Sequence, residues 1–395
     1  MPKASIVMAT TSNLSALNGP SIHFINLANE LSRLGHPISI LMPQLEAPLA
    51  ISFDAEVRQI GKGNARRVGL PATLSAVGMM RAISRIKADV LYLRASPATF
   101  LLAIAAKRQP KLGLVVEYNG WLAEDASVLG YPAWACRLTR SLQLSEARQA
   151  DSIRVVTSGL KSILTSYGIP AERIAAIGNG TSTSVFRPMK KAECRASLGL
   201  EGEGPVLGFV GNLWPGVDFA TLFQALVLLR ASGRTARLLV VGDGVERQRL
   251  EGEAARLLPA GVVRFLGSQK PEAAAVAIGA SDLGLAPFLR IRNERVGLSP
   301  LKLRDYAAAG RPVVATELGG INELASEPWL FMAEPENPHA LAKAIERCLD
   351  SDLPALNRQA RAYAEANFSW ATVAKSVSSL VSCVAAPRLA AQERH

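Results

Sequence analysis

Cysteine, histidine and aromatic residues are scarce in this chain, and each shortage excludes a class of protein. The 395 residues include four cysteines, with no CxxC pair among them, and four histidines, one of which is His395. A zinc site or a disulfide framework needs such residues in clusters, so neither is expected, and the dispersed cysteines fit a reducing compartment. Aromatic residues make up only 6%. Because few rings are available to stack on bases, we expect no nucleic-acid partner.

Long hydrophobic runs are missing as well. No stretch comes near the roughly 18 unbroken apolar residues of a membrane span, and the apolar positions near the start are too few for a signal-peptide core. A cytoplasmic protein is therefore expected, with peripheral binding to the cytosolic face of a membrane left open. Hydrophobic residues make up 49% and charged residues 19%, which excludes a disordered chain.

The balance of charge is basic. Lysine and arginine total 44 against 33 aspartate and glutamate, which gives a formal net charge of +11. Such a charge favours an anionic partner. A phosphorylated ligand, an acidic membrane face and a nucleic acid all fit, and the charge alone does not choose among them.

Short β-branched runs alternate with longer helical patterns in both halves of the chain. Strands are expected at 5–9, 38–42, 89–93, 113–118, 152–157 and 173–177, and then at 206–210, 237–241, 263–266, 283–286, 312–315 and 329–332. The helices include 21–34, 218–231, 244–257, 271–279, 300–309, 320–325 and 338–350. Alternation of this kind predicts parallel sheets with helices on both faces.

Two such series predict two Rossmann-like α/β domains. At roughly 150 residues per domain, the length allows two or three. We place the first domain at residues 1–188, the second at 189–369, and a final helix at 370–395 that crosses back to the first domain. Ligands of open parallel sheets bind at the carboxyl ends of the strands. The functional residues are therefore sought in the loops that follow strands.

The segment from Gly297 to Gly320, GLSPLKLRDYAAAGRPVVATELGG, is the strongest candidate site. Ser299 followed by proline is typical of a helix start, with serine as the cap. The unpaired N–H groups of such a start, together with the helix dipole, form an anion site. The members of this predicted turn are Leu298, Ser299, Leu301 and Lys302, and Lys302 adds a full charge. Asp305, one turn later, fits an acceptor for ribose hydroxyls. A plain capped helix with solvated side chains is the alternative.

A basic loop precedes this segment. It carries Arg290, Arg292 and Arg295, and Glu294 lies between them. Three arginines beside an anion site suggest that they clamp a diphosphate. Glu294 either faces the sugar, in a catalytic role, or pairs with an arginine. An exposed basic loop with no ligand is the alternative.

Glycine loops follow other predicted strands. Gly211 and Asn212 come after the first strand of the second half, and Gly242 comes after the next. Glycine lets a ligand approach the backbone, whereas the incomplete GxG at residue 242 does not support a dinucleotide site. Gly19 opens a helix in the first half and suggests a second anion contact. His23, one turn further, is interpreted as a packing residue, with a catalytic role as the alternative.

Two polar residues follow a buried strand of the first half. Glu117 and Asn119 are expected at its carboxyl end, where they would bind a sugar hydroxyl or supply a base. A simple Asn-Gly turn is the alternative. Residues 74–87 form an amphipathic stretch whose apolar side either packs on the core, which we favour, or rests on an anionic membrane.

Taken together, these segments resemble glycosyltransferase family 4, a retaining family with the GT-B fold, over almost the whole chain. The resemblance is carried by NGPSIHFINLANELSRLGHPISILMP, by ADSIRVVTSGLKSILTSYGIPAERIAAIGNGTSTSVFRP, and by GFVGNLWPGVD, LLVVGDG, VRFLGSQ, SDLGLAPF and the Gly297–Gly320 segment. It implies two Rossmann-like domains that face each other across a cleft. It also implies a nucleotide-diphosphate sugar donor on the second domain, an acceptor on the first, transfer with retention, and no metal or other cofactor.

The resemblance also assigns individual positions. Asp305 falls on the family's second glutamate, the ribose ligand, and residues 298–302 fall on its diphosphate-binding turn. Three positions depart from the family pattern: Asn212 stands where an arginine is usual, the same loop has no lysine, and Gly297 replaces the first glutamate. The arginine loop and Lys302 would then supply the missing charge.

Three functions follow from this reading. The first is a retaining glycosyltransferase with a glycan, polysaccharide or lipid-linked acceptor. The second keeps the fold as a nucleotide-sugar isomerase or a phosphorylase, for which no set of added acids and bases or cofactor lysine is evident. The third is a degenerate transferase that serves as a scaffold or binding subunit, which the three departures favour.

Overall fold

The computed structural model describes residues 3–12, 14, 19–45, 49, 52–60, 70–200, 202, 204–291 and 293–392. The chain forms two compact units. Unit 1 contains the residues up to Gly178 and those from Trp370 onward, and unit 2 contains Asn179–Ser369. The chain therefore passes between the units twice, at Gly178–Asn179 and at Ser369–Trp370.

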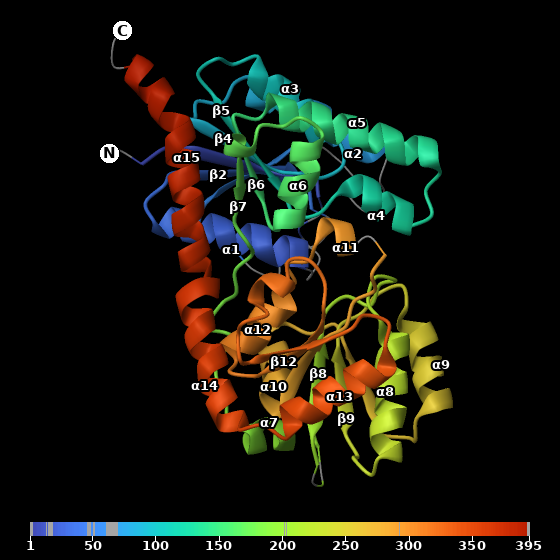
Figure 1. Cartoon of the computed structure of the whole chain (residues 1–395). Helices are drawn as coiled ribbons and strands as arrows, with labels where there is room; N and C mark the ends of the chain where they lie inside the picture. The colour runs from blue at the N-terminus through green and yellow to red at the C-terminus, as the bar shows by residue number, and fades with distance from the viewer. Residues whose placement is uncertain are drawn as a thin grey trace. The chain divides into compact units, whose positions relative to one another are not determined.

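Unit 1 is built on a seven-stranded sheet whose strands are ordered β3-β2-β1-β4-β5-β6-β7 (Figure 1). All of its strand pairs are parallel. The strands are β1 (Ile6–Ala9), β2 (Ile38–Pro43), β3 (Glu56–Ile60), β4 (Val90–Arg94), β5 (Gly113–Tyr118), β6 (Ser152–Val155) and β7 (Ile174–Ala176). The order reverses direction between β1 and β4, which is the point where open α/β sheets bind ligands.

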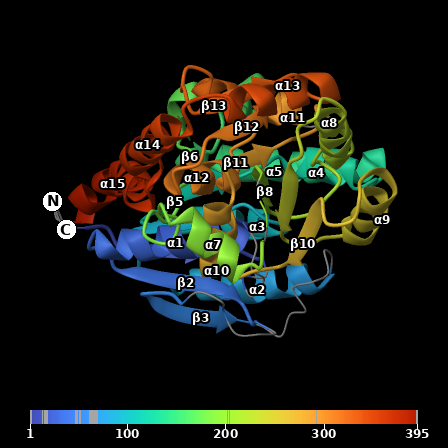
Figure 2. The ribbon, with the colours of Figure 1, turned by 90° about the horizontal axis from the view of Figure 1, so that it is seen from below.

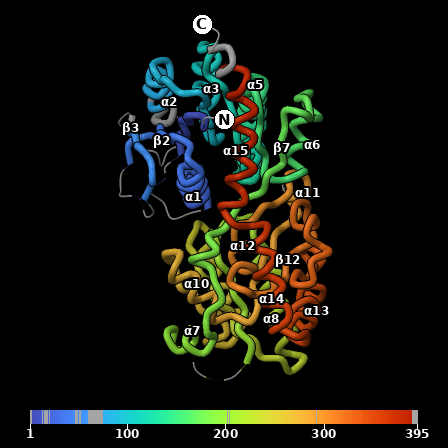
Figure 3. The backbone as a smooth tube through the Cα atoms, turned by 90° about the vertical axis from the view of Figure 1, so that its left-hand side faces the viewer, coloured from blue at the N-terminus to red at the C-terminus, as the bar shows by residue number. Residues whose placement is uncertain are grey.

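The helices of unit 1 include the one that returns from the end of the chain. They are α1 (Gly19–Arg33), α2 (Leu70–Ile83), α3 (Thr99–Lys107), α4 (Leu122–Val128), α5 (Ala133–Gln149), α6 (Ser158–Ser166) and α15 (Trp370–Gln392), with a short turn, η1, at Ala171–Arg173. Helix α15 packs along α1 (Figure 3). Its Ser378 hydroxyl lies 2.7 Å from Nε2 of the buried His36, and its Val384 packs against Gly113.

Unit 2 repeats the design with six parallel strands in the order β10-β9-β8-β11-β12-β13. The strands are β8 (Val206–Val210), β9 (Arg237–Val241), β10 (Val263–Gly267), β11 (Leu283–Ala286), β12 (Val313–Thr316) and β13 (Leu330–Ala333). The order reverses between β8 and β11. The loops after these two strands should therefore hold the ligand of this unit.

Helices and short turns complete unit 2. They are α7 (Lys191–Ser197), α8 (Phe219–Ala231), α9 (Arg247–Leu257), α10 (Pro271–Ala280), α11 (Asn293–Val296), α12 (Leu301–Ala308), α13 (Pro338–Leu349) and α14 (Leu353–Tyr363), with η2 (Asn322–Leu324) and η3 (Ala364–Phe368). Asp218, Asn337 and Asp352 cap α8, α13 and α14 by accepting a backbone N–H. These side chains satisfy amides that would otherwise be unpaired.

The predicted parallel α/β architecture is confirmed in both units. Strand β3 was not predicted, because its sequence EVRQI has no continuous apolar run and the strand lies at the sheet edge (Figure 2). Of the helix predicted at residues 320–325, only Asn322–Leu324 form a helical turn, and it is a 3-10 turn and not an α-helix. Helix α9 begins at Arg247, since the residues before it belong to the loop that follows β9. The apolar side of α2 packs on the core as favoured, with Met79 and Ile83 fully buried.

Replacement of Gly284 by alanine should destabilise unit 2. A methyl group there would lie 2.3 Å from the ring of the fully buried Tyr306, whose hydroxyl accepts the Val210 N–H at 2.7 Å. Overpacking of this kind costs about 1–3 kcal/mol. We therefore expect a lower urea midpoint for Gly284→Ala. Gly252→Ala is the control, because Gly252 lies within α9 with open space around it, and alanine there should add about 0.5–1 kcal/mol. Equal midpoints for the two variants would contradict this packing.

Candidate functional site

The first turn of α12 lies at the heart of the candidate site in unit 2. Pro300 is the cap residue of α12, and no side chain caps this end. The expectation that Ser299 caps the helix is wrong, because its hydroxyl instead accepts the Asn179 N–H at 3.3 Å. An end without a side-chain cap leaves backbone N–H groups for another acceptor, and an anion is the acceptor that the helix dipole favours.

Lys302, in this first turn, is buried, and no carboxylate among the described residues pairs with it. Its side chain is 9% exposed, and Nζ lies 3.6 Å from the ring centroid of Phe209 and 5.0 Å from that of Phe288. Within the described ranges, Nζ has no hydrogen bond or ion pair. Burial holds the pKa of Lys302 well below its usual range. An ammonium that lies over ring faces and has no described carboxylate partner should bind strongly to an anion that reaches it.

One glycine loop lies beside this ammonium, and a second glycine loop packs against the first. A Cβ atom on Gly211 would lie 2.9 Å from both Cε and Nζ of Lys302, and one on Gly242 would lie 1.9 Å from the Gly211 carbonyl oxygen. Both glycines have positive φ, 146° and 134°, which side chains rarely allow. The exposed Asn212 follows Gly211. Gly211, Asn212, Gly242 and Lys302, four predicted site residues, are thus brought to the carboxyl ends of β8 and β9.

Asp305 lies one turn further along α12 and is held from outside the helix. Its Oδ1 accepts the Thr181 hydroxyl at 2.6 Å. Burial raises the pKa of Asp305 to about 7, even though the Thr181 hydrogen bond and the charge of Arg304 lower it. Asn179 also binds this region, since its side-chain amide donates to the Ser299 carbonyl at 3.1 Å. The first residues of unit 2 therefore hold Ser299, just before α12, and Asp305, within it.

The turn before α12 differs from the prediction in one respect. The Leu298 N–H donates to the Gly319 carbonyl at 2.7 Å, so the expectation that it is unpaired is wrong. A Cβ on Gly320 would lie 2.2 Å from the Leu298 carbonyl, so the two loops are in close contact. This hydrogen bond joins the loop after β12 to the turn before α12, and Leu298 therefore fixes the position of that turn. Leu301 opens the helix and is partly buried.

One arginine of the predicted clamp, Arg290, is engaged with acids. The Arg290 guanidinium lies 3.6 Å from Glu294, 3.5 Å from Glu334 and 4.0 Å from Glu336. Glu294 and Arg295 are exposed in α11. Arg292 lies outside the described residues. In this structure Glu294 pairs with an arginine, which was the alternative to its catalytic role.

In unit 1, Glu117 lies at the centre of a buried ionic cluster. Its carboxylate is fully buried, 2.6 Å from His23 Nε2 and 2.7 Å from Arg154 Nη1, and it also accepts the Tyr92 hydroxyl. Burial would raise the pKa of Glu117, but the charges of His23 and Arg154 outweigh that effect and hold the pKa well below its usual range. An enclosed carboxylate with these partners is suited to positioning its neighbours.

Asn119 is partly buried and donates its side-chain amide to the Glu117 carboxylate. His23 is 2% exposed and packs edge-on against Trp370, with ring centroids 5.2 Å apart, so its interpretation as a packing residue fits the structure. Gly19 is the first residue of α1 and lies on the same helix as His23. Glu117 and Asn119 are thus joined with His23 of α1 in a buried network.

Several polar and aromatic groups were missed by sequence reasoning. Thr10 and Thr11 follow β1, and Ser96 follows β4, at the reversal point of unit 1. The hydroxyls of Thr10 and Thr11 lie 3.2 and 2.8 Å from Ser96 Oγ. Thr181 and the rings beside Lys302 were missed in unit 2. Hydroxyls directly after a predicted strand are a readable signal, whereas the contact of Thr181 with α12 joins residues 124 apart in sequence.

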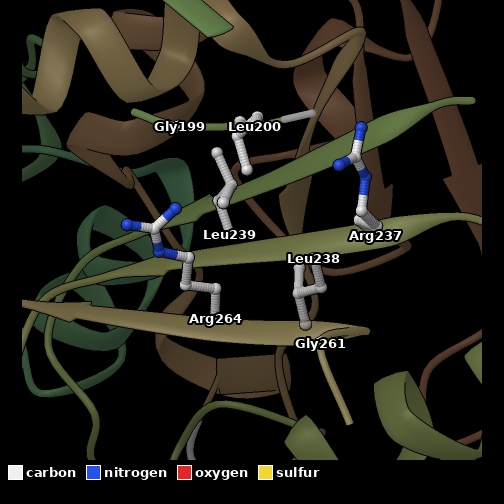
Figure 4. Close-up of a pocket in the computed structure, with 7 residues that line it drawn as sticks. All are labelled: Gly199, Leu200, Arg237, Leu238, Leu239, Gly261 and Arg264. Atoms are coloured by element: carbon white, nitrogen blue, oxygen red, sulfur yellow. The ribbon is translucent and has the colours of Figure 1, made fainter. Parts of the chain in front are cut away.

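A separate cavity of about 330 Å³ lies at the amino ends of β9 and β10. The glycine loops lie at the opposite, carboxyl ends of the strands, where ligands of such sheets bind. Arg237 and Arg264 stand at its two ends in Figure 4. No predicted site residue lines it. In the described part of the chain, no group of three or more His, Cys, Asp or Glu could hold a metal ion. No helix there is long and apolar enough to cross a bilayer.

Each half of the chain matches the model of a glycosyltransferase family. The model described as Glycosyltransferase Family 4 matches residues 17–185, and the model described as Glycosyl transferases group 1 matches residues 204–351. The D-inositol 3-phosphate glycosyltransferase of Acidothermus cellulolyticus is 31% identical over 307 residues, which cover 68% of this chain and 67% of that protein. The protein of the same description from Rhodococcus erythropolis is 31% identical over 280 residues, 64% of this chain but only 62% of the relative.

Among solved structures, sucrose-phosphate synthase from Thermosynechococcus elongatus has the same fold. Its TM-score is 0.79 at 20% identity, and the match covers 98% of this chain and 100% of that one. The predicted GT-B fold class, with two Rossmann-like parallel-sheet domains, is therefore confirmed.

Removal of the Glu117 carboxylate should destabilise unit 1. Glu117→Ala would leave the fully buried Arg154 without its anionic partner, and breaking a buried pair in this way costs about 3–5 kcal/mol. Urea unfolding of the variant should therefore show a clearly lower midpoint. Lys190→Ala is the matched control, because Lys190 and Glu193 form an exposed ion pair, and such pairs contribute little. A Glu117→Ala midpoint equal to that of the control would contradict the role given to the cluster.

The Asp305 carboxyl group should make stability depend on pH. Its pKa rises from 3.8 to about 7 in the folded chain, so the folded state binds the extra proton. Stability should therefore fall as pH rises from 3.8 to about 7 and then level off. Asp305→Asn keeps an oxygen that can accept the Thr181 hydroxyl but does not titrate. The free energy of unfolding of the variant, minus that of the wild type, should increase across this range. A difference that is flat with pH would contradict the raised pKa.

Proposed function

This chain belongs to glycosyltransferase family 4, and on that premise we propose that it transfers a sugar from a nucleotide-diphosphate sugar to a glycan, polysaccharide or lipid-linked acceptor. Unit 2 binds the donor and unit 1 the acceptor. The reaction proceeds with retention at the anomeric carbon and needs neither a metal ion nor another cofactor. Because the aligned region covers only part of its relatives, both the donor sugar and the acceptor are part of the proposal.

The buried ammonium of Lys302 is the observation that carries this proposal. It lies in the first turn of α12, next to the backbone of Gly211 and without a described carboxylate. A diphosphate at this position pairs with the protonated Lys302 and with backbone N–H groups of a helix start that no side chain caps. As the bond to the sugar breaks, negative charge grows on the leaving diphosphate, and a fixed, desolvated cation stabilises that charge. This is the task that a metal ion would otherwise perform.

Asp305 supports the second half of the donor site. A carboxylate held by Thr181 at 2.6 Å retains lone pairs that accept hydrogen bonds from ribose hydroxyls. It lies one turn beyond Lys302 on the same helix. The diphosphate and the ribose of a single donor would therefore contact consecutive turns of α12.

Nucleoside diphosphates should bind without added metal. Titration calorimetry with the diphosphates of uridine, guanosine and adenosine in the presence of a chelator tests this directly. We expect measurable affinity for at least one, and Lys302→Met should weaken it by about tenfold or more, since charge-assisted hydrogen bonds are worth roughly 1.5–3 kcal/mol. Arg290→Met is the comparison variant, because its guanidinium is already surrounded by three carboxylates. Absence of binding by all three diphosphates would refute the donor site.

Diphosphate binding should also take up a proton. Burial holds the pKa of Lys302 low, and an anion beside Nζ should raise this pKa. The lysine should therefore take up a proton when the diphosphate binds. At mildly alkaline pH, the binding enthalpy should therefore depend on the protonation enthalpy of the buffer, and the slope should show that protons pass from the buffer to the protein. The apparent Kd should increase with pH. Lys302→Met should abolish this uptake. Proton release, or uptake that persists in the variant, would contradict the assignment.

A non-catalytic scaffold is the second candidate. It is favoured by the engagement of Arg290 with three carboxylates and by Gly297 at the position of the family's first glutamate. A scaffold of this kind would bind the diphosphate but would neither transfer the sugar nor slowly hydrolyse the donor. Product analysis by mass spectrometry with each nucleotide sugar separates the two candidates.

A further inference from the structure

Large apolar side chains are exposed together where α4 ends and α5 begins. Leu129, Tyr131, Trp134 and Leu138 are 61%, 49%, 64% and 53% exposed. Nine large hydrophobic side chains are exposed in the described part of the chain, and these four fall within ten residues. Isolated apolar residues on a surface are ordinary, whereas a contiguous group marks an interaction site. We call these four residues the α4–α5 patch.

The patch is held outward by the packing of both helices. The inner face of α5 is buried through Gln143, Leu144, Glu146 and Ala147, and α5 contacts α3, α4 and β5. Gly130 turns the chain between the helices with φ of 78°, and the Tyr131 N–H donates to the Ala126 carbonyl at 3.0 Å. Trp134 and Leu138, four residues apart, therefore share the outer face of α5.

The same outer face carries positive charge. Arg137 and Arg148 are exposed on α5, so Trp134, Arg137, Leu138 and Arg148 follow helical spacing. Arg140 packs against the Tyr167 ring at 6.0 Å. The one acid of α5, Glu146, is buried and accepts the Tyr118 hydroxyl at 3.0 Å. On this helix the exposed charge is therefore of one sign.

The mixture of side chains selects the partner. Tryptophan, tyrosine and leucine enter the boundary between headgroups and acyl chains, and arginine pairs with phosphate there. Anionic headgroups add attraction for each nearby arginine. A second copy of the chain is disfavoured, because a symmetric contact would bring the arginines of two α5 helices together. The acids of α4, Glu124 and Asp125, are partly buried in its first turn.

We propose that the α4–α5 patch docks this protein on the surface of an anionic phospholipid bilayer, with α5 lying along the interface. This location differs from the amphipathic stretch at residues 74–87, whose Met79 and Ile83 are fully buried in α2. Docking places unit 1 at the surface where a lipid-linked molecule is accessible. The proposal does not depend on the donor site, because none of the residues of α12 contributes to the patch.

Flotation with lipid vesicles tests the proposal on the full chain. Vesicles of phosphatidylcholine with phosphatidylglycerol should carry the wild-type protein upward, whereas vesicles of phosphatidylcholine alone should carry much less. The double variant Trp134→Ser/Leu138→Ser should bind at least tenfold more weakly, since it removes two apolar side chains that enter the bilayer on docking. The matched control is Val77→Ser/Val227→Ser, which changes two apolar side chains that are both 40% exposed elsewhere and should bind as the wild type does.

Further readouts separate the roles of the side chains. Arg137→Gln/Arg148→Gln should reduce binding to the anionic vesicles and weaken its dependence on salt. Addition of vesicles should shift tryptophan emission to shorter wavelength in the wild type but not in Trp134→Ser. All substituted side chains are exposed, so thermal unfolding should be nearly unchanged, and this measurement verifies that each variant folds.

The following results would overturn the proposal. They are wild-type protein that fails to float with anionic vesicles, equal binding to neutral vesicles, or undiminished binding by Trp134→Ser/Leu138→Ser. A dimer in sedimentation velocity that the same variant dissociates, without vesicle binding, would assign the patch to a second copy of the chain. Loss of diphosphate binding with intact flotation would refute the donor site alone.

Discussion

An ammonium group that is buried without a described counter-ion is the constraint on which the site in unit 2 depends. Lys302 Nζ lies over the rings of Phe209 and Phe288. The backbone of residue 211 runs beside it and has a φ of 146°, a conformation that favours glycine. Burial of a charge without a partner costs free energy. The fold tolerates this cost at the carboxyl ends of its central strands, where a bound anion would offset it.

Buried polar groups hold the chain on both sides of its first crossing between the units. In unit 2, Asn179 and Thr181 bind Ser299 and Asp305, and Thr181 N–H also donates to the Phe368 carbonyl at 2.7 Å. In unit 1, Arg154 donates to the carbonyls of Ile177 and Gly178 at 3.1 and 2.7 Å. Residues just before and just after the first crossing are therefore fixed by buried polar groups.

The second crossing is fixed in the same manner. Thr181 forms a bridge with Ser369, and the next residue, Trp370, packs on His23. His23 and Arg154 both bind the Glu117 carboxylate. Through His23, Glu117 supports Trp370 at the second crossing, and through Arg154 it supports Gly178 at the first. These contacts give a physical reason for a fully buried acid at the end of β5.

The sequence predicted the sheets well because parallel strands that are buried on both faces are nearly continuous apolar runs, as in β5 and β9. It could not predict β3, an exposed edge strand without such a run. Lys302 and Gly211 were recognisable because each follows a strand or begins a helix. The pairing of Leu298 with Gly319, of Ser299 with Asn179 and of Asp305 with Thr181 joins distant segments. Local patterns carry no information about such contacts.

The location of a bound diphosphate tests the central claim most directly. A crystal structure of the protein with the nucleoside diphosphate that binds best should place a phosphate oxygen within hydrogen-bond distance of Lys302 Nζ and against the backbone of Gly211, with the ribose hydroxyls on Asp305. Phosphates bound elsewhere, such as between Arg237 and Arg264, with Lys302 still enclosed by its aromatic rings, would contradict the account.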